Sequence, residues 1–298
     1  MPRLLPLLAL LAVLCGCGAT RAAGRPADPA SAPARASAGT CTPVRGESHI
    51  GDALVHVPRR ARAPLPLVVA FHGARGTGDG FSGESGLSRS AERHGFAVLY
   101  PTAGSSRHFW SLNRAAEPDD IARLRALLPR AVRRACADPS RVYATGVSNG
   151  GGFAARVGCE MADTFAAVAP VAGGYSSLDP CPDGTRTSVL EIHGSADQIV
   201  PYEGRGPDRD GDVREYVSAW ARRAGCDARP RISHPARYVT RVVHRHCDAG
   251  YAVEHLRLEG TDHGWPGAAP PWPRHHPAGV LARELVWHFF ADKRLSRE

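Results

Sequence analysis

Lysine is almost missing from this sequence, although the chain is basic. Only Lys293 is a lysine among the 37 Lys and Arg residues, and the formal net charge is +8. The arginines are scattered along the chain, with no long run and no interleaved aromatic residues. A nucleic-acid-binding surface concentrates basic residues on one face or along one helix. We therefore interpret the positive charge as a solvated surface and expect no nucleic-acid partner.

Long hydrophobic runs are also missing outside the N-terminus, which excludes a transmembrane helix from the body of the chain. Hydrophobic residues nevertheless make up 43% of the sequence, so the chain is not disordered throughout. A length of 298 residues is enough for one large α/β domain with a substantial core. We see no internal repeat and no second domain.

The N-terminus has the pattern of a targeting segment. An apolar run over residues 4–14 leads into Leu-Cys-Gly-Cys at residues 14–17. This stretch resembles the bacterial lipobox, which implies a lipoprotein signal peptide over residues 1–16 and a lipidated Cys17 as the first mature residue. The alternative is an ordinary secretory signal that is cleaved near Ala22. Both predict a secreted or cell-surface protein, and the lipid would anchor it to the outer face of a bacterial membrane.

The next stretch is rich in Ala, Pro, Ser, Gly and Arg. Residues 17–40 contain almost no large apolar side chain, so they can bury little area and are predicted to be a flexible tether. Residues 41–298 are the predicted folded domain.

Apolar runs and amphipathic stretches alternate through this domain. Short apolar runs predict strands at residues 51–58, 65–71, 96–100, 142–144, 165–171, 188–194, 241–246 and 251–258. Helical patterns occur at residues 82–94, 118–136, 151–161, 212–224 and 277–292. This alternation predicts an α/β fold with a mostly parallel central sheet and helices on both faces.

The most informative motif is Gly-Val-Ser-Asn-Gly at residues 146–150. A G-x-S-x-G sequence between a strand and a helix is typical of a nucleophile elbow, in which a strained turn presents the serine hydroxyl to open space. The flanking glycines allow the strand and the helix to approach each other closely. We therefore predict that Ser148 is a nucleophile.

A nucleophilic serine needs a base, and the base needs a carboxylate to orient it. Asp197 follows a predicted strand and a tight Gly-Ser-Ala turn, where such a carboxylate is expected, although it could instead cap its own turn. His263 lies between glycines in a loop after the last predicted strand. The order Ser148, Asp197, His263 is the chain order of the α/β-hydrolases.

Ester hydrolysis also requires donors for the oxyanion, usually two backbone amides. We expect one from Asn149 at the start of the helix. The other is expected in the loop after the strand at residues 65–71, from Ala74, with Gly73 and Arg75 as alternatives. His72 is predicted to be structural.

Four sequence blocks together resemble a known family. They are His72-Gly73, the stretch Arg141-Val-Tyr-Ala-Thr-Gly-Val-Ser-Asn-Gly-Gly151, His193-Gly-Ser-Ala-Asp197 and His263-Gly-Trp-Pro-Gly267. They are similar to the polyhydroxybutyrate-depolymerase-like esterases, which are related to the feruloyl and acetylxylan esterases of carbohydrate esterase family one. The resemblance covers roughly residues 41–292.

The resemblance implies an α/β-hydrolase that cleaves carboxylic esters, such as hydroxyalkanoate, feruloyl or acetyl esters, without a metal or cofactor. It implies that Ser148 is the nucleophile, Asp197 the orienting acid and His263 the base. The substrate is expected to be an ester, including a polymeric or polysaccharide-linked one. We expect no polymer-binding or carbohydrate-binding module of the kind that some relatives carry. Trp110 and Trp265 are candidates for the substrate pocket, with core or rim packing as the alternative.

Six of the eight cysteines lie in the predicted domain. Six cysteines allow 15 pairings, and position along the chain suggests Cys41–Cys136, Cys159–Cys181 and Cys226–Cys247. The alternative is buried free thiols, which are less expected in the oxidising environment of a secreted protein.

Three alternatives to an esterase remain at this stage. The same triad on the same fold serves serine peptidases and acyltransferases, and a cell-surface binding protein could keep the fold without turnover.

A calcium loop at residues 208–212 is also conceivable, but Ala219 occupies the twelfth position, where an EF-hand needs an acid.

Overall fold

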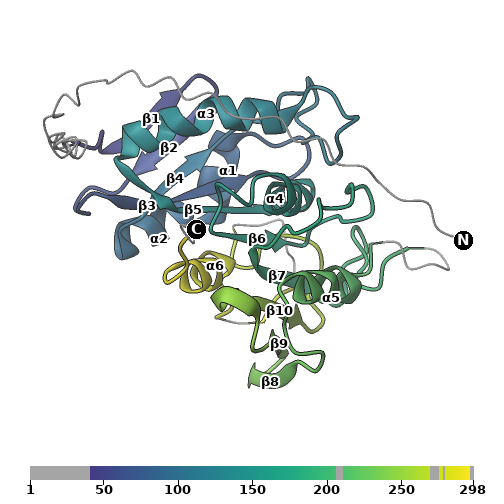
Figure 1. The fold of residues 1–298 in the computed structure, drawn as a ribbon. Coiled ribbons are helices and arrows are strands. Elements are labelled where there is room, and N and C mark those ends of the chain that lie inside the picture. The colour runs from purple at the N-terminus through teal and green to yellow at the C-terminus, as the bar shows by residue number, and fades with distance from the viewer. Residues whose placement is uncertain (1–40, 206–210, 269–274, 278, 296–298) are drawn as a thin grey trace, which may run out of the picture. The chain divides into compact units, whose positions relative to one another are not determined.

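The sheet at the centre of the protein has ten strands, of which the middle six are parallel. The computed structural model describes residues 41–205, 211–268, 275–277 and 279–295. Within them the strand order is β1-β2-β4-β3-β5-β6-β7-β10-β9-β8 (Figure 1). All neighbouring pairs from β4 to β10 are parallel, and the pairs outside these strands are antiparallel. The predicted mostly parallel sheet is therefore confirmed.

The strands have the following bounds: β1 (Gly46–Ile50), β2 (Ala53–Val57), β3 (Leu65–Phe71), β4 (Ala97–Tyr100), β5 (Ala137–Val147), β6 (Ala167–Val171), β7 (Ser188–Gly194), β8 (Arg231–Ala236), β9 (Val239–His244) and β10 (Val253–Leu258). The helices are α1 (Gly78–Ser85), α2 (Leu87–His94), α3 (Asp120–Ala135), α4 (Asn149–Glu160), α5 (Val213–Arg223) and α6 (Ala282–Phe290), with a 3₁₀ turn η1 (Asp248–Gly250).

Helices cover both faces of the sheet, as the sequence predicts. Apolar side chains of α3, α4 and α5 pack into one core cluster, and those of α1, α2 and α6 pack into the other. Alternate residues of a single strand supply the two cores: Leu67 and Val69 of β3 face the first, whereas Val68 and Ala70 face the second. Burial on both faces explains the continuous apolar runs of these strands.

One predicted helix is broken in two. The pattern at residues 82–94 predicts a single helix, but α1 ends at Ser85 and α2 begins at Leu87. Gly86 between them has a φ of +67°, in the left-handed region that ends helices. The first helix also begins earlier than predicted, because the Thr77 side chain caps it by accepting from the Gly80 amide.

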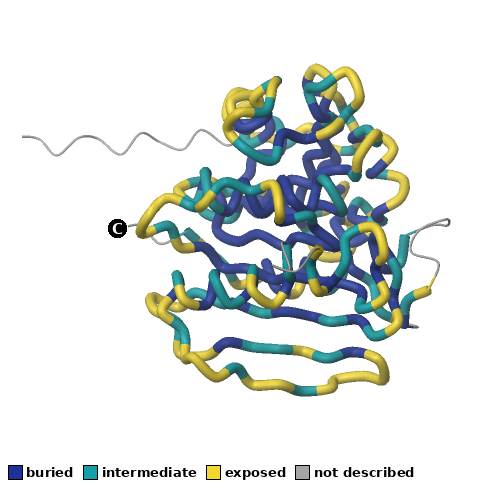
Figure 2. The backbone as a smooth tube through the Cα atoms, turned by 90° about the vertical axis from the view of Figure 1, so that its right-hand side faces the viewer, coloured by how far each residue is buried: buried dark blue, intermediate teal, exposed yellow. Residues whose placement is uncertain are grey.

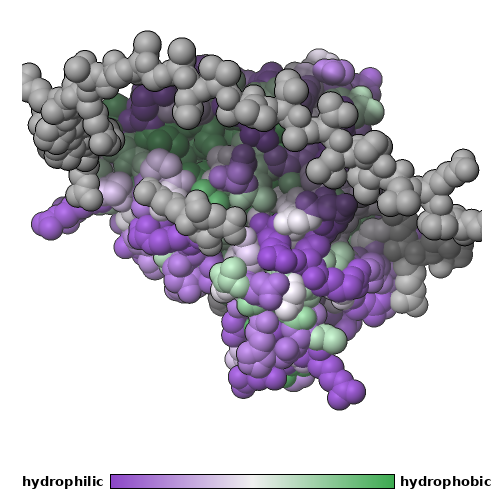
Figure 3. Space-filling view, viewed as in Figure 1, coloured by the Kyte–Doolittle hydropathy of each residue, from purple (hydrophilic) through white to green (hydrophobic). Residues whose placement is uncertain are grey.

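The sequence does not reveal strand β8, although the strand predicted at residues 241–246 overlaps its hairpin partner β9. Strand β8 is largely exposed along its length (Figure 2). It has no buried face, so it lacks the apolar alternation by which a strand is recognised. The surface over this hairpin is mostly hydrophilic (Figure 3), which is the usual protection of an edge strand against pairing with another chain.

All three predicted disulfides are confirmed: Cys41–Cys136, Cys159–Cys181 and Cys226–Cys247. The first joins the start of the described chain to the residue after α3, and the third joins the end of α5 to the segment after β9. Among the described helices, none combines the length and the apolar character that crossing a bilayer requires.

Candidate active site

Ser148 lies at a strained turn between β5 and α4. Its backbone has φ +59° and ψ −123°, a conformation that non-glycine residues rarely adopt. A Cβ on Gly146 would lie 2.4 Å from the Gly150 carbonyl oxygen, and a Cβ on Gly150 would lie 2.3 Å from the His72 carbonyl oxygen. Both glycines are thus required by close backbone approach, as the G-x-S-x-G motif predicts.

Asp197 and His263 are directly paired. Nδ1 of His263 lies 2.7 Å from Oδ2 of Asp197, although 66 residues separate them in the sequence. The other carboxylate oxygen, Oδ1, accepts the amides of Ile199 and Val200 at 2.9 and 2.8 Å. Burial opposes the charge, but hydrogen bonds from His193 and His263 hold the pKa of Asp197 well below its usual value. An ionised Asp197 fixes the proton on Nδ1 of His263 and leaves Nε2 as a base.

The three residues follow neighbouring parallel strands at the same edge of the sheet. Ser148 follows β5, Asp197 lies just after β7, and His263 lies in the loop after β10. The strand ends are in register, since Val147 pairs with Val171 and Val171 pairs with Ile192. Ser148 is partly exposed, and its hydroxyl makes no hydrogen bond to any residue in the described part of the chain, His263 included. The structure thus pairs His263 with Asp197 but not with Ser148.

The structure removes one of the candidate oxyanion donors. The Arg75 amide donates to the His108 carbonyl at 3.1 Å, so Arg75 is excluded as an alternative. The Ala74 and Asn149 amides donate to no acceptor within the residues that the structure describes. Asn149 is the first residue of α4, where helix amides are unpaired and the helix dipole favours negative charge. Ala74 and Asn149 stay the predicted donors.

His72 is structural, as its place suggests, and its tautomer follows from its partners. The Ala103 amide donates to its Nε2 at 3.0 Å, so Nδ1 carries the proton and donates to the Gly73 carbonyl at 2.7 Å. Burial lowers the pKa of His72, which keeps the ring neutral. His72 thereby joins the loop that carries Ala74 to the loop after β4.

Asn149 holds the loop after β4 from the start of helix α4. Its side-chain oxygen accepts the Trp110 amide at 2.7 Å, and its nitrogen donates to the Trp110 carbonyl at 3.3 Å. The Trp110 indole donates to the His72 carbonyl at 2.9 Å. Trp110 thus connects both segments that carry the predicted oxyanion donors.

The two tryptophans are largely buried packing residues in this structure. Trp110 is 5% exposed and stacks on Phe153, while Trp265 is 2% exposed and packs edge-on against Phe81. The Trp265 indole donates to the Ser85 carbonyl. Both indole nitrogens are therefore satisfied inside the protein, which favours the packing alternative.

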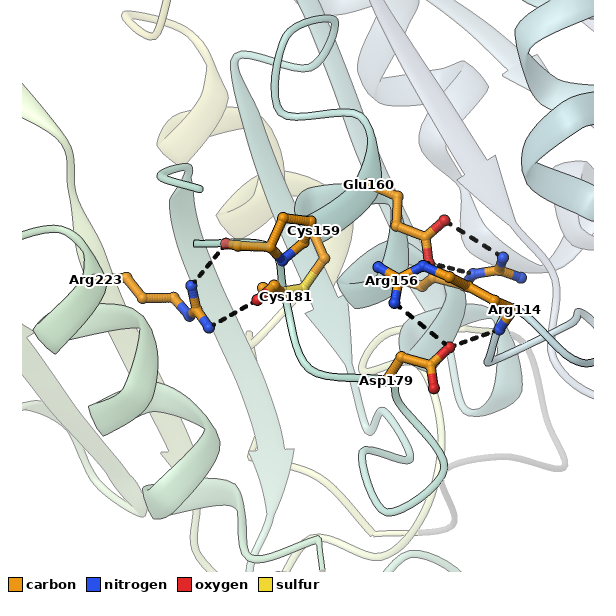
Figure 4. Close-up of a disulfide and its surroundings, with 8 residues drawn as sticks. Arg114, Arg156, Cys159, Glu160, Asp179, Cys181 and Arg223 are labelled. Atoms are coloured by element: carbon orange, nitrogen blue, oxygen red, sulfur yellow. Dashed lines mark hydrogen bonds and ion pairs between the residues drawn. A yellow bond between two sulfur atoms is a disulfide. The ribbon is translucent and has the colours of Figure 1, made fainter. Parts of the chain in front are cut away.

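An ion-pair cluster next to the Cys159–Cys181 disulfide fastens the loops after β4 and β6 to helix α4. Arg156 of α4 donates to the carbonyl and hydroxyl of Ser111 and pairs with Glu160. Arg114 lies 3.4 Å from the same Glu160, and its amide donates to Asp179 (Figure 4). The loops on both sides of the elbow are thus held to the helix that begins at it.

Sequence reasoning missed a set of buried ionisable groups behind Asp197. Glu191 and His193 of β7 have fully buried side chains, and Nδ1 of His193 lies 2.9 Å from Oε1 of Glu191. Nε2 of His193 donates to the Val200 carbonyl at 2.9 Å and lies 3.3 Å from Oδ2 of Asp197. The sequence does carry a signal for this set, because two ionisable residues occur in a strand that is otherwise buried on both faces.

No described residues form a group of three or more His, Cys, Asp or Glu side chains that could hold a metal ion. Residues 208–210 of the conceivable calcium loop lie outside the described residues, as do Cys17 and the whole of residues 1–40.

A family model, "Esterase PHB depolymerase", matches residues 50–177, which include β2 to β6 and the elbow. The chain is also 31% identical over 245 residues to NocK of Nocardia uniformis subsp. tsuyamanensis, which carries the name of an esterase. That alignment covers 74% of this chain and 71% of NocK. This chain belongs to the PHB-depolymerase-like esterase family.

Further relatives of this esterase-family chain differ in the substrates that they are named for. It is 26% identical to feruloyl esterase B of Piromyces equi over 66% of this chain and 39% of that protein. It is also 26% identical to poly(3-hydroxyalkanoate) depolymerase C of Paucimonas lemoignei, over 71% and 58% respectively. The chain thus spans well under two thirds of these two relatives.

A solved structure gives the same fold. The acetyl xylan esterase from Aspergillus awamori superposes with a TM-score of 0.61 at 18% identity, covering 80% of this chain and 93% of that one. The structural similarity therefore confirms the predicted α/β-hydrolase fold.

Proposed function

We propose that this protein is a serine hydrolase of carboxylic esters. The observation that carries the proposal is the His263–Asp197 pair at the same sheet edge as the strained Ser148 turn. Membership in the esterase family supports the same reaction.

In the proposed reaction, the Ser148 hydroxyl attacks the ester carbonyl while Nε2 of His263 takes its proton. The negative charge on the carbonyl oxygen is stabilised by the amides of Ala74 and Asn149. The alcohol leaves with the proton from His263, and Ser148 keeps the acyl group. Water, activated by His263, then attacks the acyl-enzyme and releases the acid. Asp197 keeps the His263 ring oriented and stabilises the imidazolium that forms in each half-reaction.

The test is Ser148→Ala, assayed with p-nitrophenyl acetate and with a fluorophosphonate probe. We expect turnover to fall by roughly three orders of magnitude or more, and labelling by the probe to disappear. Ser176→Ala is the matched control, because Ser176 is exposed and lies outside the site. Undiminished turnover or labelling in the Ser148 variant would refute the proposal. No labelling of the unmodified protein would favour a binding protein without turnover.

The substrate class is part of the proposal. The relatives named above include a feruloyl esterase, a poly(3-hydroxyalkanoate) depolymerase and an acetyl xylan esterase. We propose an ester of one of these kinds as the substrate. Hydroxybutyrate oligomers, feruloylated sugars and acetylated xylan, compared at equal ester concentration, would identify the preferred acyl group. A preference for amides, or for transfer to an added alcohol over water, would instead indicate a peptidase or an acyltransferase.

We also propose that the protein acts outside the cytosol, anchored through a lipid on Cys17. The three disulfides support an oxidising compartment. Labelling of cells with a fatty-acid analogue should mark the protein, and Cys17→Ala should remove the label. An unlabelled protein that is released to the medium would contradict the anchor.

A further inference from the structure

The buried groups behind Asp197 form a continuous chain of acids and imidazoles. It begins on β10, where Nε2 of His255 lies 2.9 Å from the Tyr202 hydroxyl. Nδ1 of His255 lies 2.7 Å from Oε2 of Glu191, whose other oxygen accepts from His193. His193 in turn faces Asp197 at 3.3 Å. The chain therefore reaches from the interior to the acid of the proposed triad.

The contacts of His193 identify its protonation state. Nε2 faces a backbone carbonyl and a carboxylate, neither of which can donate a hydrogen bond. Nδ1 faces the carboxylate of Glu191. With Glu191 ionised, as its lowered pKa indicates, both ring nitrogens carry protons, so the ring is an imidazolium between two carboxylates, Glu191 and Asp197.

Further polar and charged groups surround this imidazolium and its partner Glu191. The Tyr175 hydroxyl donates to Oε1 of Glu191 at 2.8 Å. Four more groups lie on adjacent elements. The ring centre of Tyr202 is 6.0 Å from that of His193, and Arg257 lies over the Tyr202 ring. Tyr216 of α5 stacks on Tyr175, and His255 of β10 contacts the Tyr202 hydroxyl. Burial opposes the charge, but Glu191, Asp197 and the Val200 carbonyl raise the pKa of His193 to about 10. Burial likewise opposes ionisation of Glu191, yet His193 and His255 lower its pKa to about 2.

We propose that His193 is a positioning residue for Asp197. Its positive charge, which Glu191 fixes, orients the Asp197 carboxylate and weakens the attraction of that carboxylate for a proton on His263. The orienting part follows from shared contacts: His193 and Asp197 both bind Val200, through its carbonyl and its amide. The electrostatic part follows because a cation beside Asp197 offsets part of the negative charge that would stabilise protonated His263. This inference rests on the proposed triad.

The variant that isolates the charge is Glu191→Gln. Glutamine keeps the size of the side chain and can still accept from the Tyr175 hydroxyl, but it lacks the negative charge that fixes the protonated ring, so His193 should lose its positive charge near neutral pH and keep its Nε2 bond to Val200. Losing the nearer positive charge should raise the acidic limb of the kcat/KM–pH profile by about 0.5–1 pH unit. A purely structural role would lower kcat/KM at every pH without moving the limb.

Tyr202→Phe is the matched control. It removes a buried hydroxyl from the far end of the same chain, and it leaves the contacts of His193 with Glu191 and Asp197 in place. We expect the acidic limb to stay where it is in the unmodified protein. A folded Glu191→Gln protein with an unmoved limb would overturn the proposal, and so would an equal shift in the control.

Two NMR measurements decide the question without enzymatic activity. In the unmodified protein, both ring nitrogens of His193 should give ¹⁵N shifts of protonated nitrogens at pH 7; a neutral ring would overturn the proposal even if Glu191→Gln does not fold. In the folded variant, the titration midpoint of the His263 ring should rise along with the kinetic limb. If the protein has no esterase activity, the proposed function fails, while these two readouts still test the coupling between His193 and His263.

Discussion

Gly150→Ala should damage both the stability and the activity of the protein, because the second glycine of the elbow has no room for a side chain. A Cβ at this position would lie 2.3 Å from the His72 carbonyl oxygen and 2.4 Å from the Phe71 carbonyl oxygen. Cβ atoms essentially never approach other atoms within 3.0 Å, so helix α4 would have to move by about 0.7 Å from β3. The contacts are with backbone, which cannot rotate away as a flexible side chain can.

The expected magnitudes follow from this geometry. Alanine gains about 0.5–1 kcal/mol over glycine within a helix, whereas forced overpacking costs about 1–3 kcal/mol. We therefore expect a net loss of roughly 1–2 kcal/mol in the free energy of unfolding. The same movement displaces the Ser148 hydroxyl and the Asn149 amide, and a misplacement of about 1 Å can cost roughly 100-fold in rate.

Urea denaturation and the p-nitrophenyl acetate assay measure the two effects. Gly83→Ala is the control, since Gly83 lies in helix α1, is exposed, and has no atom within 4 Å of the added Cβ. It should raise stability by about 0.5–1 kcal/mol and leave turnover unchanged. If the Gly150 variant matched the unmodified protein in both assays, close backbone packing would not be what defines the elbow.

Three further predictions concern the acid, a disulfide and the buried ion pair. Asp197→Asn should lower kcat by about 10³- to 10⁴-fold with an unchanged circular dichroism spectrum, and a loss under tenfold would contradict its orienting role. Replacing Cys226 and Cys247 together by serine opens a link between residues 21 positions apart and should cost about 3 kcal/mol in chemical denaturation; an unchanged midpoint would argue against this account. Because the pKa of His193 is raised in the folded state, protonation of His193 stabilises the fold fully below pH 6.5, and this stabilisation is lost as the pH rises through about 10. Because the pKa of Glu191 is lowered, ionisation of Glu191 stabilises the fold above pH 4.5, and this stabilisation is lost as the pH falls through about 2. The melting temperature should therefore fall on both sides of about pH 4.5–6.5, and this dependence should flatten in Glu191→Gln.

The sheet core was predictable because its strands are buried on both faces. The strands at residues 65–71 and 188–194 are found with the predicted bounds. The outer strands were less predictable: β1 and β8 alternate weakly or not at all between apolar and polar residues, and neighbouring strands rather than their own side chains hold them in place.

The residues of the site also differ in whether the sequence could predict them. Ser148, Asp197 and His263, the residues of the proposed triad, could be named from the sequence because in this fold a nucleophile, its acid and its base follow strand ends in a fixed order, and short motifs record that order. The Trp110–Asn149 bridge was not predicted, because it joins residues 39 positions apart through a loop of no regular structure. No local pattern encodes such a bond, whose partners meet only after the sheet has formed.

Glu191 shows most clearly what a pattern of apolar residues conceals. In the run Ser-Val-Leu-Glu-Ile-His-Gly at residues 188–194, periodicity places Glu191 and His193 inside the sheet, where isolated charges are too costly to remain. The tertiary structure explains their presence: Tyr175, in the loop after β6, donates to one oxygen of the Glu191 carboxylate, and Nδ1 of His255 on β10 lies 2.7 Å from the other. A buried polar group that the core could replace by an apolar one at little cost has no structural reason to be charged. Glu191 lies six residues before Asp197, on the strand that leads to it, and we therefore infer that the charges serve the acid of the proposed site as well as the fold.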